Sequence, residues 1–163
     1  MSENLFKSKR FLPLLLTQFF GALNDNLFKN ALLMLVTLRM AEKADILSNV
    51  IAALFIIPFF LLSATAGEIS DKYDRSRVAR CLKVAELILM LGVGVVYFFQ
   101  SLPCLIVLLA LMGAQSAFFG PVKYALLPQQ LKPSELVAGN AYVEASTYVA
   151  ILLGLIVGTL LPI

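Results

Sequence analysis

Charged and amide side chains stand inside long apolar runs of this sequence. In the first run, Gln18, Asp25 and Lys29 share one helical face, because residues three, four and seven positions apart return to the same side. A charge in lipid costs about 2.5–3.5 kcal/mol, so this face should meet a bundle interior or a water-filled cavity. Such groups can bind a polar or charged ligand there. The alternative is an internal ion pair of Asp25 with Lys29 that locks the helix packing.

Two more charges could contact a ligand from other runs. Glu144 lies in the last run with no base nearby in sequence, so it is either protonated or paired with another helix. Lys123 closes the fourth run, as a simple anchor at the membrane surface or as a cationic contact for a phosphate. Glu86, one turn inside the third run, has Lys83 three residues before it, and we expect an interfacial ion pair there.

The composition excludes several kinds of chemistry. The chain has no histidine, which removes a histidine metal site, a histidine general base and a catalytic triad. Cys81 and Cys104 lie far apart without metal or redox spacing, and we expect them to be small apolar fillers. We therefore expect no enzyme, no metal and no cofactor. The net charge of +3 does not indicate nucleic-acid binding, because the bases lie in short segments between apolar runs.

The elements that must position these side chains are membrane-spanning helices. Of the 163 residues, 60% are hydrophobic, against roughly 45–50% in an ordinary soluble domain, so lipid is the expected solvent. Each apolar run is long enough to cross a hydrocarbon core of roughly 30 Å as a helix. The expected fold is all-α and integral to the membrane, with five spans at about Phe11–Leu38, Ile46–Ala66, Cys81–Phe99, Pro103–Val122 and Val137–Leu161.

Basic residues indicate the orientation. Most Lys and Arg residues fall in Met1–Arg10, Gly67–Lys83 and Lys123–Ser134, three segments that five spans put on one side of the membrane. Arg39 and Lys43 lie on the other side. Since cytoplasmic loops carry the excess of Lys and Arg, we expect a cytoplasmic N-terminus and an uncleaved first span.

Prolines and glycines indicate where helices end or approach each other. Pro121 is expected to close the fourth span, with Pro128 in the loop that follows. Gly154 and Gly158 stand four residues apart in the last span, a spacing that is typical of a face on which two helices pack closely.

The charged segment Gly67–Arg77, between the second and third runs, is expected to be a short loop that acts as a conformational switch. Gly67 would allow two helices to approach closely, and Asp71 could accept backbone N–H groups at a helix start. Arg75 and Arg77 could pair with Asp71 or with helix C-termini. Such a charged lock can break and re-form as helices move. The alternative is a solvated basic turn.

Four separated motifs, in order and across essentially the whole chain, resemble the lysophospholipid transporter branch of the major facilitator superfamily. They are FLPLLLTQFFGALNDN from Phe11, DKYDRSR from Asp71, GPVKYALLP from Gly120 and NAYVEAS from Asn140. The general superfamily loop has Gly where Asp74 stands and usually a base where Ser76 stands. The second motif departs from that pattern, but it is similar to the loop of this branch.

The resemblance implies alternating-access transport of lysophospholipids, notably lysophosphatidylethanolamine, across the bacterial inner membrane toward the cytoplasmic leaflet. By position, Asp25 matches an acid that senses the headgroup and Lys123 matches a lysine of the polar cavity, so the acid would meet the amine and the lysine the phosphate. The family has about twelve spans in two halves. Residues 1–163 would then form an apparently truncated N-terminal bundle that needs a separate second half or further copies of itself.

Three alternatives stay open. The chain could transport another small solute, or it could form the membrane portion of a fusion with phospholipid acyltransferase and acyl-carrier-protein synthetase domains. Without histidine it cannot supply the acyltransferase His-Asp pair itself. It could also be a structural membrane protein without a substrate. The expected partners are membrane lipids, a lysophospholipid substrate and a separate C-terminal transporter half, with no nucleic acid.

Overall fold

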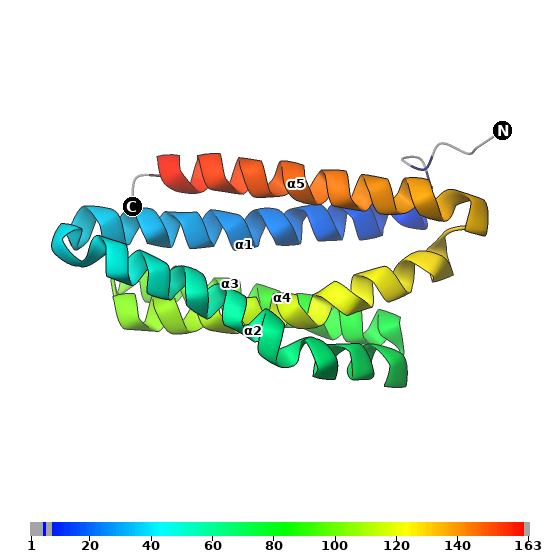
Figure 1. Cartoon of the computed structure of the whole chain (residues 1–163), viewed down its shortest axis with the longest axis horizontal. Helices are drawn as coiled ribbons and strands as arrows, with labels where there is room; N and C mark the ends of the chain where they lie inside the picture. Colours follow the sequence, from blue (N-terminus) through cyan, green and yellow to red (C-terminus); the bar gives the residue numbers. More distant parts are fainter. Residues whose placement is uncertain (1–4, 6–7, 162–163) are drawn as a thin grey trace.

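In the computed structural model, which describes Leu5 and residues 8–161, the chain forms five long α-helices and no strand within that part. The elements are α1 (Phe11–Arg39), α2 (Ala44–Lys72), α3 (Arg75–Phe98), α4 (Leu102–Gln130) and α5 (Leu136–Leu160), with 3-10 turns η2 (Ala41–Lys43) and η3 (Pro133–Glu135) (Figure 1). The expected all-α class is confirmed. Lys7, one of the N-terminal bases, lies outside the described residues.

Helices α2 to α5 are each long and apolar enough to cross a membrane, when η2 is counted with α2 and η3 with α5. Helix α1 has 29 residues, as many as α2, but amide and charged side chains interrupt its apolar run, and it is not among the helices that meet this criterion. It is also sheltered, because α5 packs along it on one side and α2 and α4 contact it on the other (Figure 1). Polar groups that must avoid lipid are thus carried by the helix at the centre of the bundle.

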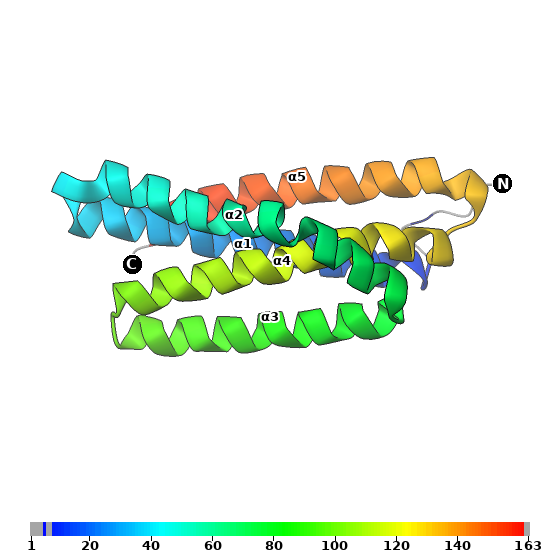
Figure 2. The ribbon, with the colours of Figure 1, turned by 60° about the horizontal axis from the view of Figure 1, so that its bottom comes forward.

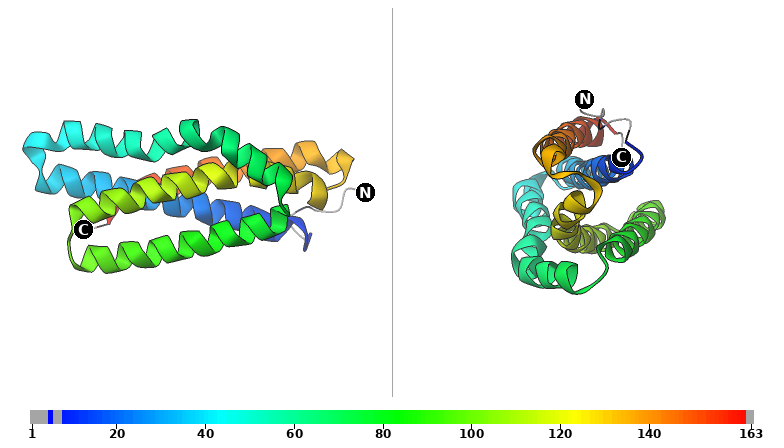
Figure 3. Two further views of the ribbon diagram at one scale, coloured as in Figure 1. Left: turned by 90° about the horizontal axis from the view of Figure 1, so that it is seen from below. Right: turned by 90° about the vertical axis from the view of Figure 1, so that its right-hand side faces the viewer.

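The helices form two pairs, α1 with α5 and α2 with α4, and α3 packs on the outside of α4 (Figures 2 and 3). The two members of each pair run in the same direction. The start of α1, the α2–α3 turn and the α4–α5 connection lie at one end of the bundle, and the other two turns lie at the opposite end (Figure 1). The described basic segments therefore share one end, as the sequence predicted.

Two apolar clusters join the pairs at different levels of the bundle. Both draw on α1 and α4, so the contact between these two helices connects the halves of the structure. The side chains of the first cluster include Phe28, Leu32, Ile51, Leu109 and Met112. Those of the second include Phe11, Leu15, Val122, Leu127 and Val143.

The predicted end of the fourth helix was wrong. Helix α4 does not stop at Pro121 but continues through Pro121 and Pro128 to Gln130, with a visible bend (Figure 1). A proline removes one backbone hydrogen bond and bends a helix, but neighbouring helices can hold the bent helix together in a membrane. Lys123 therefore lies inside α4 and not in a loop.

The segment Gly67–Arg77 is mostly helical, because α2 and α3 are separated by only Tyr73 and Asp74. The carboxylate of Asp74 accepts a hydrogen bond of 2.8 Å from the backbone N–H of Arg77 and so caps α3. The predicted role of Asp71 at a helix start was wrong, since α2 continues past that residue.

Glycines set the contact of α5 with α1. A Cβ on Gly154 would lie 2.8 Å from the carbonyl oxygen of Leu23, and one on Gly158 would lie 2.6 Å from that of Leu27. The close packing predicted from their spacing is confirmed. A Cβ on Gly67 would meet nothing within 4 Å, so the close helix approach predicted there was wrong.

We expect Gly154→Ala to lower the free energy of unfolding by about 1–3 kcal/mol, because the added methyl group forces α5 away from the α1 backbone. Gly94→Ala is the matched control. A Cβ there would meet nothing within 4 Å, and alanine is favoured over glycine in a helix by roughly 0.5–1 kcal/mol. Unfolding in lipid nanodiscs measures both variants, and equal losses would contradict the packing described here.

Candidate functional site

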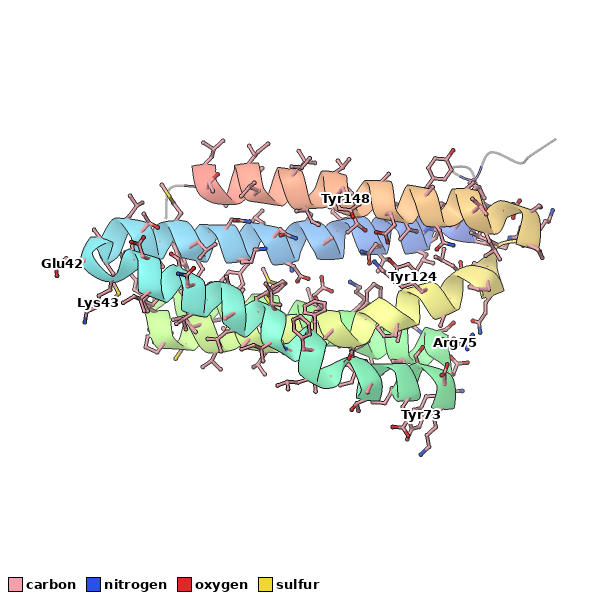
Figure 4. The ribbon with its side chains drawn as sticks, in the orientation of Figure 1. Glu42, Lys43, Tyr73, Arg75, Tyr124 and Tyr148 are labelled. Carbon is pink, nitrogen blue, oxygen red and sulfur yellow. The ribbon has the colours of Figure 1, made fainter. Side chains whose placement is uncertain are left out.

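A cluster of three polar side chains lies where α4 faces α5. The ammonium nitrogen of Lys123 is 3.9 Å from Oε1 of Glu144. The hydroxyl of Tyr124, a residue that Figure 4 labels, donates a hydrogen bond to the same oxygen. The ammonium also lies 4.7 Å from the centre of the Tyr124 ring. The side chain of Lys123 is 11% exposed and that of Glu144 is 41% exposed. Glu144 thus has a partner on another helix, which is one of the two alternatives that its sequence position left open.

Gln18 lies close to this cluster. Its buried amide donates a hydrogen bond of 3.0 Å to the hydroxyl of Thr147, which joins α1 to α5 one helical turn from Glu144. The hydroxyl of Thr147 in turn donates to the carbonyl oxygen of Val143. Gln18 therefore fixes the position of α5 beside α1 next to the charged cluster.

Asp25 is buried between α1 and α4. Its carboxylate accepts a hydrogen bond from the hydroxyl of Ser116. The other oxygen, Oδ1, is buried and has no hydrogen-bond partner among the described residues. Since a buried carboxylate oxygen without a donor is costly, Asp25 is a position at which the described bundle is not fully satisfied.

A hydrogen-bonded network continues from Ser116 into α3. The hydroxyl of Ser116 lies 3.2 Å from Oε1 of Gln115, whose amide nitrogen donates to Glu86 at 3.3 Å and to the carbonyl of Leu82 at 3.2 Å. Glu86 pairs with Lys83 at 2.6 Å. The ion pair predicted from the spacing is therefore present, and its two partly buried side chains line a cavity between α1, α3 and α4.

Gln115 and Ser116 were not among the candidates drawn from the sequence. They stand in an apolar run without a charge beside them, and only the orientation of α4 brings them to Asp25. Two adjacent polar residues at the middle of a spanning helix were the available signal.

Lys29 does not form the predicted ion pair with Asp25. Its ammonium donates a hydrogen bond of 3.0 Å to the side chain of Asn26 and lies 5.2 Å from the centre of the Phe55 ring on α2. Because Asp25 points to Ser116 on α4, the two charges on α1 serve different neighbours.

Arg75 connects the charged turn to α4. Its guanidinium donates to the carbonyl of Ala125 at 3.2 Å and to the carbonyl of Ser70 at 3.4 Å, and it lies 3.8 Å from Asp71. Asp71 and Arg77 are exposed. The contact that holds the turn in place therefore runs from Arg75 to the backbone of α2 and α4, and the exposed ion pair adds little.

A cavity of about 1170 Å³ lies elsewhere, between α1, α3 and α4. Lys9, Arg10 and Arg80 line one end of it, and apolar residues line much of the remainder. Neither Lys123 nor Glu144 lines this cavity. It lies on the α3 side of the bundle.

The candidate residues thus form two groups. Lys123 and Glu144, with Gln18 beside them, form a cluster that can bind a ligand carrying both charges. Asp25 and Lys29 hold helices together through separate contacts. Within the part of the chain that is described, no three His, Cys, Asp or Glu side chains gather as a metal site.

Comparison with known proteins identifies the family. Residues 14–162 match the sequence profile of the Major Facilitator Superfamily. The chain is 30% identical over 161 residues to proteins named lysophospholipid transporter LplT from Yersinia pestis (strain Pestoides F) and Yersinia pseudotuberculosis serotype O:3 (strain YPIII). The alignment covers 99% of this chain and 38% of each relative, so the chain spans well under half their length. No solved structure matches. This multi-pass membrane protein belongs to the major facilitator superfamily.

Proposed function

We propose that residues 1–163 form the N-terminal bundle of a transporter that moves lysophospholipids, such as lysophosphatidylethanolamine, across the bacterial inner membrane by alternating access. Family membership and the name of the relatives support a lipid substrate. The basic segments at one end of the bundle support a cytoplasmic N-terminus. The transport step needs no enzymatic chemistry, and the longer relatives support a further, C-terminal half as partner.

The observation that carries this proposal is the ion pair of Lys123 with Glu144 between two apolar helices. Charged side chains inside spanning segments are costly and face a bundle interior or a substrate pathway. The pair lies in the half of the bundle that ends in the basic segments, which is the depth of a phospholipid headgroup near the cytoplasmic surface. A lysine ammonium is a suitable contact for a phosphate.

The charged headgroup and the acyl chain of a lysophospholipid need different binding surfaces. The headgroup needs the polar cluster on α4 and α5, whereas the single acyl chain can stay against the apolar surfaces of the same helices. Exposed apolar side chains of α5, including Val149 and Leu152, offer such a surface. A water-soluble small solute would not need it, and this favours a lysophospholipid over that alternative.

We predict that Lys123→Ala lowers uptake of labelled lysophosphatidylethanolamine about tenfold or more, because the phosphate loses a charge-assisted contact of about 1.5–3 kcal/mol. The assay uses spheroplasts without their own transporter, which express the chain alone or with the C-terminal half of a relative. Lys43→Ala, an exposed lysine at the opposite end of the bundle, is the control.

Unchanged uptake in Lys123→Ala, at normal folded abundance, would contradict the site. Absence of lysophospholipid uptake in the wild type, both alone and with the second half, would contradict the proposed substrate. If Lys123→Ala lowers the amount of folded protein but not the uptake per folded molecule, Lys123 has a structural role.

We also predict that Arg75→Ala slows uptake about tenfold while lysophospholipid binding stays within about twofold, since one charge-assisted contact between α2 and α4 is lost away from the ligand. Arg77→Ala removes an exposed base from the same turn and should leave the rate unchanged. Measured uptake rates and binding affinities separate the two effects. Equal effects of both substitutions would indicate a solvated basic turn and not a switch.

A further inference from the structure

We infer that Glu144 is a built-in counter-ion of Lys123, and that a zwitterionic headgroup divides the pair, its phosphate binding Lys123 and its ammonium binding Glu144. This inference rests on the proposed function and assigns the residue that selects an amine-bearing headgroup. It differs from the assignment that the family resemblance suggested, in which Asp25 meets the amine.

The first argument is that the pair is loosely made. A direct hydrogen bond between an ammonium and a carboxylate measures about 2.7–2.9 Å, whereas Lys123 and Glu144 are 3.9 Å apart. A lysine ammonium has three donors. Within the described residues, that of Lys123 makes no hydrogen bond, only this ion pair and its contact with the Tyr124 ring. Its donors are therefore available to a phosphate without the loss of an existing hydrogen bond.

The second argument is that Tyr124 holds the carboxylate independently of the lysine. Its hydroxyl donates to Oε1 of Glu144, so Glu144 keeps one partner when Lys123 turns to a ligand. Tyr124 is half exposed and Glu144 more exposed than Lys123. An arriving headgroup therefore meets the carboxylate and the tyrosine first, and Lys123 behind them.

The third argument is the geometry of the bundle. Lys123 and Glu144 come from α4 and α5, which contact each other only sparsely, while each packs closely on a different partner helix. A group can enter between the two side chains by a small separation of these helices. The α1–α5 and α2–α4 contacts do not have to break.

Asp25 is poorly placed for the same ammonium. It is 7% exposed and bonded to Ser116. Ser116 precedes Lys123 by seven residues of α4, a rise of about 10 Å at 1.5 Å per residue. The two carbon atoms between the phosphate and the amine of phosphoethanolamine suit the 3.9 Å between Lys123 and Glu144 better than a separation of two helical turns. Glu144 is the carboxylate that such a headgroup reaches while its phosphate stays on Lys123.

The divided pair has a consequence for selectivity. When the phosphate of a phosphoethanolamine headgroup binds Lys123, the ammonium group of the same headgroup becomes the new positive partner of Glu144. A phosphoglycerol headgroup takes Lys123 but leaves Glu144 beside a second negative charge, which is unfavourable in a low-dielectric site. The cluster should therefore prefer the amine-bearing lipid, and the preference should depend on the charge of Glu144.

The test measures the affinity of the full chain in lipid nanodiscs by calorimetry. The probes are lysophosphatidylethanolamine and lysophosphatidylglycerol with the same acyl chain, with glycerophosphoethanolamine as the headgroup without a tail. We expect the wild type to prefer the ethanolamine lipid about tenfold. Glu144→Gln should remove this preference, mainly by tighter binding of the glycerol lipid. Glu42→Gln, an exposed acid at the other end of the bundle (Figure 4), should keep it.

A second variant covers the case in which Glu144→Gln does not fold. Tyr124→Phe leaves both charges in place but releases the carboxylate, and it should reduce the preference about threefold. If glycerophosphoethanolamine binds as tightly as the lipid, the divided pair is supported. The natural ligand is then a free headgroup and not a lipid.

Four results would overturn the inference. If Glu144→Gln still prefers the ethanolamine lipid but unfolds more easily, the ion pair has a structural role. A preference lost in Asp25→Asn but retained in Glu144→Gln would assign the amine to Asp25. Equal affinity of the wild type for both lipids would remove the selectivity while leaving the proposed function intact. No binding of either lysophospholipid by the wild type would overturn the proposed function together with the inference.

Discussion

The high cost of an unpaired polar group in lipid determines how this bundle is built. Helix α1 carries the largest share of such groups, and it lies at the centre, where α5, α2 and α4 surround it. Three of its polar side chains serve different neighbours: Gln18 joins α5, Asp25 joins α4 and Lys29 lies against α2. Because these contacts point in different directions, they specify how the three neighbouring helices are placed around α1.

Close packing and loose packing are separated in the structure. Gly154 and Gly158 bring α5 against the backbone of α1, and Gly113 brings α4 against the backbone of Phe55 on α2. Between the two pairs the contacts are fewer. The charged cluster of Lys123 and Glu144 lies at this weaker boundary. The glycine contacts therefore hold each helix pair together, and the proposed entry of a headgroup needs only the weaker boundary to open.

The sequence predicted what depends on composition and spacing, and missed what depends on the rotation of helices. Five helices, the packing face of Gly154 and Gly158, and a partner for Glu144 on another helix followed from apolar runs and i, i+4 spacing. The network through Gln115 and Ser116 could not be predicted, because these helices are apolar on all sides and periodicity does not reveal which face meets which neighbour. The expectation that a proline ends a helix also failed at Pro121, because packing against neighbouring helices keeps α4 helical there.

The central claim is that Lys123 and Glu144 form the headgroup site and divide between phosphate and ammonium. An experimental structure of the longer transporter with lysophosphatidylethanolamine bound tests it most directly. The account predicts the phosphate within hydrogen-bond distance of Lys123, the ammonium on Glu144, and the pair more than 3.9 Å apart. An intact pair, with the lipid bound instead in the cavity between α1 and α3, would contradict it.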